Sequence, residues 1–176
     1  MDGNCVIDVP AGVTGQVYQS DFSGNCIFDL NKEFTWPLIE DKQGRTVDLS
    51  QVMTPDKKIA YNIYLKNLQE GLYGITNLKK KVGIGFRWDV NIFKYLLMWS
   101  VYRGYYHFPF YGRTYNLALE LYSAIPDNLD EVIRLHRELS LMPGEELKTR
   151  FFTTIYESGQ RIQGFDDEYQ PISRKS

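Results

Sequence analysis

The sequence predicts a mostly β protein, an antiparallel β-sandwich with one short helix, and three observations support this fold class. Short runs rich in β-branched and aromatic residues recur along the chain, with turn residues between them. Within several runs the side chains alternate between two faces, which is the period of a β-strand. Only residues 128–137 combine a capping residue with the apolar spacing of a helix.

The first third of the chain contains one predicted strand and a long irregular segment. Residues 5–9 form a β-branched run that stops at Pro10, Ala11 and Gly12, so we expect a strand and then a turn. Residues 20–58 contain many glycine, proline and aspartate turn signals. We therefore expect this segment to be ordered but irregular.

The middle of the chain predicts longer strands. From residue 59 the period is two, with one face formed by Ile59, Tyr61, Ile63 and Leu65 and the other by Asn62, Tyr64 and Lys66. Further strands are expected at residues 71–76, 82–88, 95–102 and 115–122. Residues 77–81 predict a solvent-exposed hairpin tip, and residues 104–112 separate the last two strands.

The last third predicts the helix and the closing strands. Asn128 can cap the helix, and Asp130 and Glu131 suit its first turn. Residues 142–145 predict a turn, residues 147–156 a strand, and residues 160–165 a closing hairpin. We expect residues 1–165 to form a single domain and residues 166–176 a flexible tail.

Composition and charge narrow the class of protein. Hydrophobic residues make up 43% of the 176 residues, which excludes a disordered chain. The net charge of −2 lacks the basic excess of a nucleic-acid binder. No signal peptide or apolar run of about 20 residues is found, so we expect a cytoplasmic protein without membrane contact. Cys5 and Cys26 could be two free thiols or one disulfide.

Motifs for cofactors and metals are missing from the sequence. There is no P-loop, and Gly83 and Gly85 lack the third glycine of a dinucleotide-binding turn, so they predict a strand with small residues. His107 and His136 lie far apart without a metal-ligand spacing. We therefore expect no cofactor and no metal.

Residues 99–127 contain the candidate site. Residues 105–113 combine aromatic side chains with His107 and Arg113. In the strand that follows, Glu120 shares one face with Asn116 and Ala118, while three leucines occupy the other face. Glu120 is therefore expected to point away from the leucine core, toward the aromatic loop. A carboxylate beside aromatic rings suits sugar binding, and partial desolvation would raise its pKa for general acid or base chemistry.

Each candidate also has a purely structural interpretation. Glu120 could form an ion pair with Arg113 across a strand. His107 could be a partly buried loop histidine, and the aromatic run could belong to the core. His136 is expected at the surface or as a helix cap.

Three segments carry a resemblance to a known family: residues 85–89 (Gly-Phe-Arg-Trp-Asp), 95–99 (Tyr-Leu-Leu-Met-Trp) and 109–120 (Pro-Phe-Tyr-Gly-Arg-Thr-Tyr-Asn-Leu-Ala-Leu-Glu). Together they resemble the C-terminal half of the aldose 1-epimerase family, in its galactose-mutarotase-like branch. Residues 143–145 (Pro-Gly-Glu) and 147–156 resemble the closing strands of that fold. The resemblance covers most of residues 1–165.

This resemblance implies a fold and an activity. The fold would be the galactose mutarotase-like supersandwich, here incomplete, which binds a hexose in a concave face. Glu120 matches the catalytic base that takes the anomeric hydroxyl proton, and Asp127 resembles a residue that follows it. Trp99, His107, Tyr111 and Arg113 would line the sugar cleft. The family's acid histidine belongs to the half that would precede Met1, and neither His107 nor His136 matches it.

Two hypotheses about function follow. The first is a carbohydrate-binding, mutarotase-like protein, an isomerase only when a complementary N-terminal half supplies the missing acid. The second is a non-enzymatic subunit or interaction module whose aromatic face docks a partner chain. The expected partners are a sugar ligand and either that complementary half chain or a homo-oligomer. A half sandwich would leave an open edge and an exposed apolar face, which predicts association.

Overall fold

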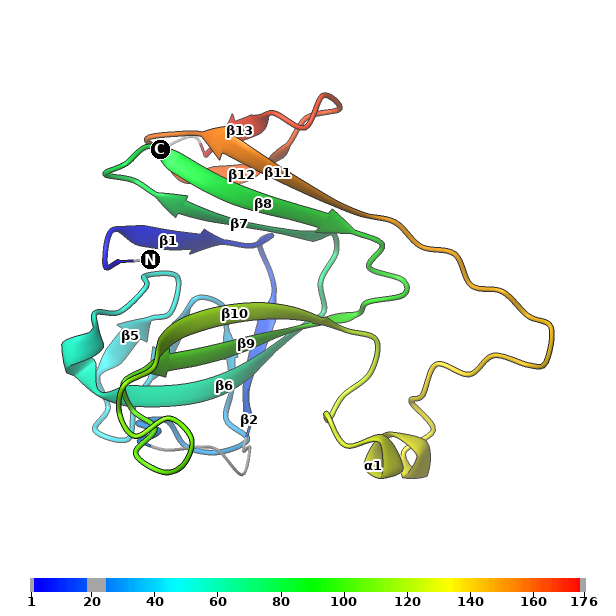
Figure 1. Ribbon diagram of the computed structural model, residues 1–176, viewed down its shortest axis with the longest axis horizontal. Coiled ribbons are helices and arrows are strands. Elements are labelled where there is room, and N and C mark those ends of the chain that lie inside the picture. The colour runs from blue at the N-terminus through cyan, green and yellow to red at the C-terminus, as the bar shows by residue number, and fades with distance from the viewer. Residues whose placement is uncertain (1, 19–24, 175–176) are drawn as a thin grey trace.

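The computed structural model describes residues 2–18 and 25–174, and it has two main antiparallel sheets facing each other with one short helix (Figure 1). The predicted β-sandwich class is confirmed. The four-stranded sheet has the order β1 (Cys5–Asp8), β7 (Gly71–Asn77), β8 (Val82–Trp88) and β11 (Phe151–Glu157). The five-stranded sheet has the order β10 (Tyr115–Tyr122), β9 (Tyr95–Tyr102), β6 (Ile59–Lys66), β2 (Thr14–Tyr18) and β3 (Glu33–Thr35).

Smaller elements complete the fold. Two hairpins form separate two-stranded sheets, β4 (Leu38–Glu40) with β5 (Thr46–Asp48) and β12 (Ile162–Phe165) with β13 (Pro171–Ser173). A 3₁₀ turn, η1 (Pro55–Lys57), precedes β6, and α1 (Leu129–Arg134) follows β10. The Asn128 side chain accepts a hydrogen bond from the Glu131 amide at 3.0 Å, so the predicted helix cap is confirmed. No helix in residues 2–18 or 25–174 is long and apolar enough to span a membrane.

The hydrophobic core lies between the inner faces of the two main sheets. Strand β6 contributes the predicted apolar face, and β9 adds Leu96, Met98 and Tyr102, each with no exposed surface. The apolar surface removed from water here is the main contribution to folding. Loops of the irregular segment close one end of the core with Phe28 and Leu49, both fully buried.

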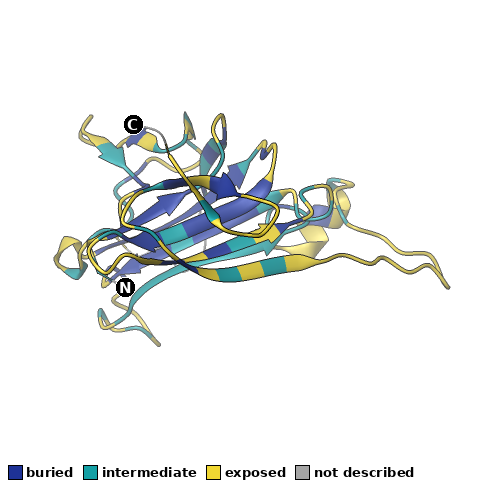
Figure 2. Ribbon diagram, turned by 90° about the horizontal axis from the view of Figure 1, so that it is seen from above, coloured by how far each residue is buried: buried dark blue, intermediate teal, exposed yellow. Residues whose placement is uncertain are grey.

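The five-stranded sheet covers the inner face of the four-stranded sheet near β1 and β7 but not near β11. Strand register places Ile7, Ile75, Ile84 and Ile155 in one row across β1, β7, β8 and β11. The exposed fraction rises along this row, from 0% at Ile7 to 39% at Ile84 and 79% at Ile155. The β11 side of the inner face is therefore open to solvent. Figure 2 shows β11 as alternating intermediate and exposed residues that continue into an exposed arm.

The outer face of the four-stranded sheet is covered by the β12–β13 hairpin. Tyr156, Ile162 and Phe165 form a small buried cluster there. Gly85 makes this approach possible, because a Cβ there would collide with the Phe165 ring, and a Cβ on Gly83 would collide with the ring of Tyr156 on β11. The two glycines are thus small residues in a strand, as predicted.

An ion pair fastens this hairpin to β1. The Arg161 Nη1 atom lies 2.8 Å from Asp8 Oδ1, and the Ile162 amide donates to Asp8 Oδ2 at 3.0 Å. Arg161 Nη2 also donates to Ser50 Oγ at 2.7 Å. Both oxygens of the buried Asp8 carboxylate therefore have partners in the segment that follows β11. We call this set of contacts made by Arg161 and Ile162 the Arg161 clamp.

The structure differs from the sequence expectations in four places. Strand β2 has no counterpart among the expected strands, and the segment expected to be irregular contains β3, β4 and β5. Strand β11 begins at Phe151 rather than at residue 147. The segment expected to be a flexible tail contains β13, which pairs with β12. Each of these short strands forms through a partner strand rather than through a strong local pattern.

Candidate functional site

The outer face of the five-stranded sheet displays the candidate residues. Leu117, Leu119 and Leu121 on β10 pack against the core between the sheets. Because side chains alternate along a strand, Glu120 lies on the opposite, outer face with Asn116 and Ala118. Glu120 therefore points away from the leucine core, as predicted, but no contact with the aromatic loop is seen among the described residues.

Strand register shows which residues neighbour Glu120 on this face. Glu120 pairs with Leu97, and Ala118, one step along the same face, pairs with Trp99. Trp99 in turn pairs with Asn62 on β6. Glu120, Trp99 and Asn62 therefore lie on one face of three adjacent strands, in neighbouring rows, and we call them the outer-face triad.

One end of the outer face is covered by the loop between β9 and β10, residues 103–114. The rings of Tyr105 and Phe110 stack at 5.2 Å, and this pair packs with the buried residues Ala60 and Val101. Phe110 also meets Trp99 edge to face at 6.1 Å. This loop forms an aromatic wall beside the triad.

The other end is covered by the segment around α1. Ile125 packs with Tyr64 and Leu97, and the Tyr18 hydroxyl donates to Asp127 Oδ1 at 2.5 Å. Figure 1 shows the β9–β10 loop and α1 at opposite ends of the sheet. The outer-face triad lies between these two walls.

Polar groups on this face are held in a partly desolvated environment. Asn62 is only 7% exposed, and its Oδ1 atom has no hydrogen-bond partner among the described residues. Burial raises the pKa of the Tyr64 hydroxyl, and the charge of Asp127 raises it further. Burial also raises the pKa of Tyr122, with a second contribution from the carboxylate of Glu120.

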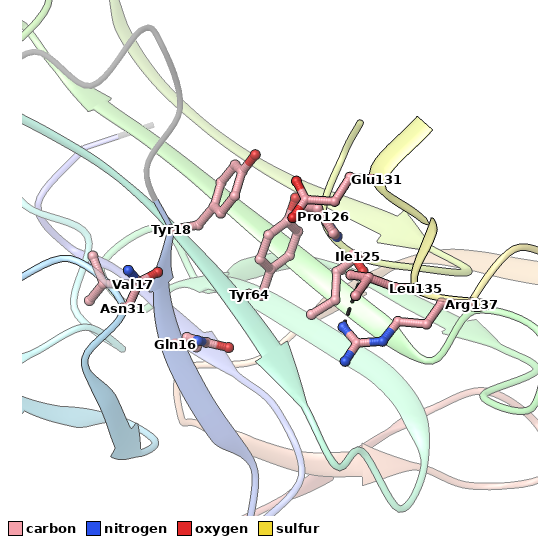
Figure 3. A pocket seen from close by; sticks show the side chains of 10 residues that line it. All are labelled: Gln16, Val17, Tyr18, Asn31, Tyr64, Ile125, Pro126, Glu131, Leu135 and Arg137. Carbon is pink, nitrogen blue, oxygen red and sulfur yellow. Dashed lines mark hydrogen bonds between the residues drawn. The ribbon is translucent and has the colours of Figure 1, made fainter. Parts of the chain in front are cut away.

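A pocket of about 250 Å³ adjoins this region, between β2, β6 and the α1 segment (Figure 3). The rings of Tyr18 and Tyr64 stand next to each other, with centroids 4.8 Å apart, and both line the pocket. Glu131 and Arg137 line it from the α1 side, and Gln16 lines it from β2. Arg137 Nη1 donates to the Ile125 carbonyl at 3.5 Å. The pocket thus combines aromatic surface with an amide, a carboxylate and a guanidinium group.

The structure brings together some of the predicted site residues and separates others. Trp99 and Glu120 share the outer face, whereas His107, Tyr111 and Arg113 are exposed on the 103–114 loop. Within residues 2–18 and 25–174, neither Glu120 nor Arg113 takes part in an ion pair, so the structural interpretation that pairs them finds no support. His107 is exposed rather than partly buried, and His136 is exposed after α1, as expected.

Sequence reasoning missed several residues of this face. The alternation along residues 59–66 places Asn62 and Tyr64 on the polar face of their strand, but it does not connect them with Glu120. The missing information is the pairing of β6 with β9. The sequence did not indicate Gln16 and Tyr18 as site residues, because β2 itself is not among the expected strands.

Other reactive groups lie outside this face. Cys5 is buried and Cys26 is half-buried, and both are free thiols. Burial raises the pKa of the Cys26 thiol. In the part of the chain that the structure describes, no group of three or more His, Cys, Asp or Glu side chains could hold a metal ion.

Comparison with known proteins returned no match. No protein-family model, no curated protein and no solved structure is significantly similar to this chain.

Proposed function

We propose that this chain is a carbohydrate-binding protein of the aldose 1-epimerase-like kind, and that the outer face of its five-stranded sheet binds a hexose or related sugar. The observation that carries the proposal is the outer-face triad. A carboxylate, a buried amide oxygen without a hydrogen-bond partner among the described residues, and an indole ring lie on adjacent strands. Buried polar groups are normally hydrogen-bonded, and the Asn62 Oδ1 atom, which has almost no exposed surface, would accept a hydrogen bond from a sugar hydroxyl after its side chain rotates.

The three side chains fit the parts of a sugar. The Trp99 ring can stack on the apolar face of a pyranose, while Asn62 and Glu120 accept hydrogen bonds from its hydroxyls. The exposed residues His107, Tyr111 and Arg113 lie on the loop whose aromatic pair borders Trp99. They form the rim of the proposed site, and Arg113 adds guanidinium donors to the amide and indole donors of the triad.

The proposed role of Glu120 in catalysis is that of the base in anomer interconversion. Its carboxylate takes the proton of the anomeric hydroxyl as the bond between the anomeric carbon and the ring oxygen breaks and the carbonyl forms. An acid must donate a proton to the ring oxygen in the same step. Neither histidine belongs to the outer-face triad, since His107 is exposed on the 103–114 loop and His136 is exposed after α1. We therefore propose that a second chain supplies the acid and that this chain alone binds sugar without converting one anomer into the other.

Titration by NMR tests the binding. The purified chain is titrated with glucose, galactose and their 6-phosphates while the indole resonances are followed. We expect the Trp99 indole to shift, and the Trp88 indole to remain unchanged because it donates to the Phe93 carbonyl in the core.

Two variants make this test specific. Glu120→Gln and Asn62→Ala should each weaken sugar binding at least several-fold, whereas Glu70→Gln, an exposed carboxylate in the β6–β7 turn, should leave binding unchanged. Equal affinity in Glu120→Gln and the unsubstituted chain would contradict the proposal.

The alternative hypothesis, a partner-docking module, has one supporting observation. Phe108 is 77% exposed and Tyr111 is 57% exposed at the tip of the 103–114 loop. Exposed aromatic residues at a loop tip are typical anchors of protein interfaces. If Phe108→Ser abolishes association with a partner while the sugar titration shows no shift in any indole, the docking function is favoured.

A further inference from the structure

Strand β11 is an unprotected edge of the four-stranded sheet. It pairs with β8 along its whole length and has no other partner strand among the described residues. Its seven residues, Phe-Phe-Thr-Thr-Ile-Tyr-Glu, include no proline, no lysine and no bulge, which are the usual features that prevent edge pairing. The backbone donors and acceptors on its free side are therefore available to another strand.

The inner face beside this edge is apolar and open. Phe151 is 65% exposed and Ile155 79%, while Val82 and Ile84 on β8 are 40% and 39% exposed. These four side chains lie on the same face, because register pairs Ile155 with Ile84 and Glu157 with Val82. Exposed apolar side chains next to a free edge indicate an interaction surface.

We propose that this surface is the interface of a homodimer in which β11 pairs with β11 of a second copy. The two strands would run antiparallel about a two-fold axis at Thr153, joining the two four-stranded sheets into one continuous sheet. The proposal is independent of the sugar site, which lies on the other sheet.

In this register the two copies of β11 place side chains that pair favourably opposite each other. With Thr153 opposite Thr153 of the second copy, Phe151 faces Ile155 of that copy, and Ile155 faces its Phe151. Aromatic residues opposite β-branched residues are favourable cross-strand pairs, as are two threonines. A two-fold axis perpendicular to the sheet keeps the same face inward in both copies, so the exposed apolar side chains of β11 on this face find an apolar partner.

The exposed arm before β11 supports the same arrangement. Residues 139–150 are exposed throughout and include Leu139, Leu141, Met142 and Leu147. This arm leaves the sheet at Phe151, where β8 ends at Trp88. In the proposed register, residues 147–150 would lie beside residues 156–159 of the second copy and gain the neighbours that they lack in one chain.

A charge-pair experiment tests the proposal. Sedimentation is measured for the unsubstituted chain and for Thr153→Lys and Thr153→Glu, alone and mixed. We expect the unsubstituted chain to be a dimer and each variant alone to be a monomer, because like charges would meet at the two-fold axis. The equimolar mixture should restore a dimer, since lysine then faces glutamate.

Controls separate loss of pairing from loss of folding. Thr46→Lys adds the same charge to an exposed residue of β5 and should remain a dimer. Ile155→Lys is a second variant at a highly exposed position and should also be a monomer, with an unchanged far-ultraviolet circular dichroism spectrum. A monomeric unsubstituted chain at every concentration, dimers of Thr153→Lys alone, or a mixture that stays monomeric would each overturn the proposal.

Discussion

Strands β9 and β11 are both rich in apolar and aromatic residues, yet they have opposite environments. Six of the eight residues of β9 are buried, whereas four of the seven residues of β11 are exposed and only Tyr156 is buried. Strand β9 has a partner strand on each side and is covered on both faces. Strand β11 has one partner strand among the described residues and an open inner face. Burial is therefore decided by what lies opposite a strand, not by its own composition.

The isoleucine row across the four-stranded sheet shows the same dependence of burial on the opposite layer within a single sheet. Ile7 and Ile155 have the same side chain on the same face, but Ile7 belongs to the core cluster between the sheets and Ile155 does not. An apolar residue left exposed at the end of such a row is a sign of a missing neighbour. Substitutions can test this contrast between the covered β1 side and the open β11 side of the sheet.

The largest loss of stability is expected at the Arg161 clamp, which fastens the β12–β13 hairpin to β1 at the covered edge of the four-stranded sheet. Arg161→Met would leave the Asp8 carboxylate, with only 3% of its side chain exposed, without its cation. Breaking a buried ion pair in this way costs about 3–5 kcal/mol of unfolding free energy. Urea denaturation measures the loss.

The matched control is Arg134→Met, because the pair of Arg134 with Glu131 is exposed. Exposed pairs contribute about 0–1 kcal/mol. Equal losses of stability in the two variants would show that the buried ion pair of the clamp stabilises the fold no more than an exposed ion pair does.

Isoleucine truncation compares the two environments directly. Ile63 on β6 is fully buried in the core, so Ile63→Ala should lower the unfolding free energy by about 2–5 kcal/mol. Ile155→Ala should change it by no more than about 0.5 kcal/mol in the monomer. These values are compared by urea denaturation at a concentration where the chain is monomeric. A large loss in Ile155→Ala under these conditions would mean that the β11 side is already covered within one chain.

A smaller effect is expected on the outer face of the four-stranded sheet. The Cβ of Gly85→Ala would collide with the Phe165 ring and displace the β12–β13 hairpin, at a cost of about 1–3 kcal/mol. Gly164→Ala on β12 is the control, since its Cβ would meet no atom within 4 Å. Thermal unfolding of both variants shows whether this face is as tightly closed as the core.

The smallest effect concerns the ionisation of two tyrosines on opposite faces of that sheet. Burial raises the pKa of Tyr73, on the inner face, and of Tyr156, on the outer face, to about 12 each. Burial is the only cause for Tyr73, whereas the hydroxyl of Tyr156 also bonds Thr76 Oγ1 at 2.7 Å. Because the folded-state pKa values lie above the unfolded value of about 10, the folded chain holds these protons longer. Their contribution to stability is present below a pH of about 10 and is lost as the pH rises toward about 12.

Ultraviolet absorbance during an alkaline titration measures this ionisation. In Tyr73→Phe and Tyr156→Phe, the decline of unfolding free energy above a pH of about 10 should be shallower than in the unsubstituted chain. If the unfolding free energy of Tyr73→Phe declines above a pH of about 10 as steeply as that of the unsubstituted chain, the pKa of Tyr73 is not raised by burial. The inner face would then be as open at β7 as it is at β11.

The parts of the structure that could be predicted are those with a local signal. The alternation along residues 115–122 was sufficient to orient Glu120, and Asn128 followed by acidic residues was sufficient to start α1. Both depend on residues adjacent in sequence, whose geometry is set by the strand or helix period.

The rest depended on contacts between distant residues. Asn62 became a site residue only because β6 pairs with β9, which lies about thirty residues further along the chain. Strand β2 contains Gly15, which lowers its strand propensity, and it is held by β6 and β3. The exposure of β11 could not be predicted either, because a period of two does not show whether a second layer covers the strand.

The Arg161 clamp also sets the order in which the chain can assemble. It joins Arg161 to Asp8, residues 153 positions apart, and β1 finds its strand partner β7 only after residue 71. During synthesis, β1 must therefore wait until the chain as far as Arg161 has left the ribosome before the Asp8 carboxylate gains its ion-pair partner. Contacts of such long sequence separation slow folding and prolong the time for which apolar strands are exposed.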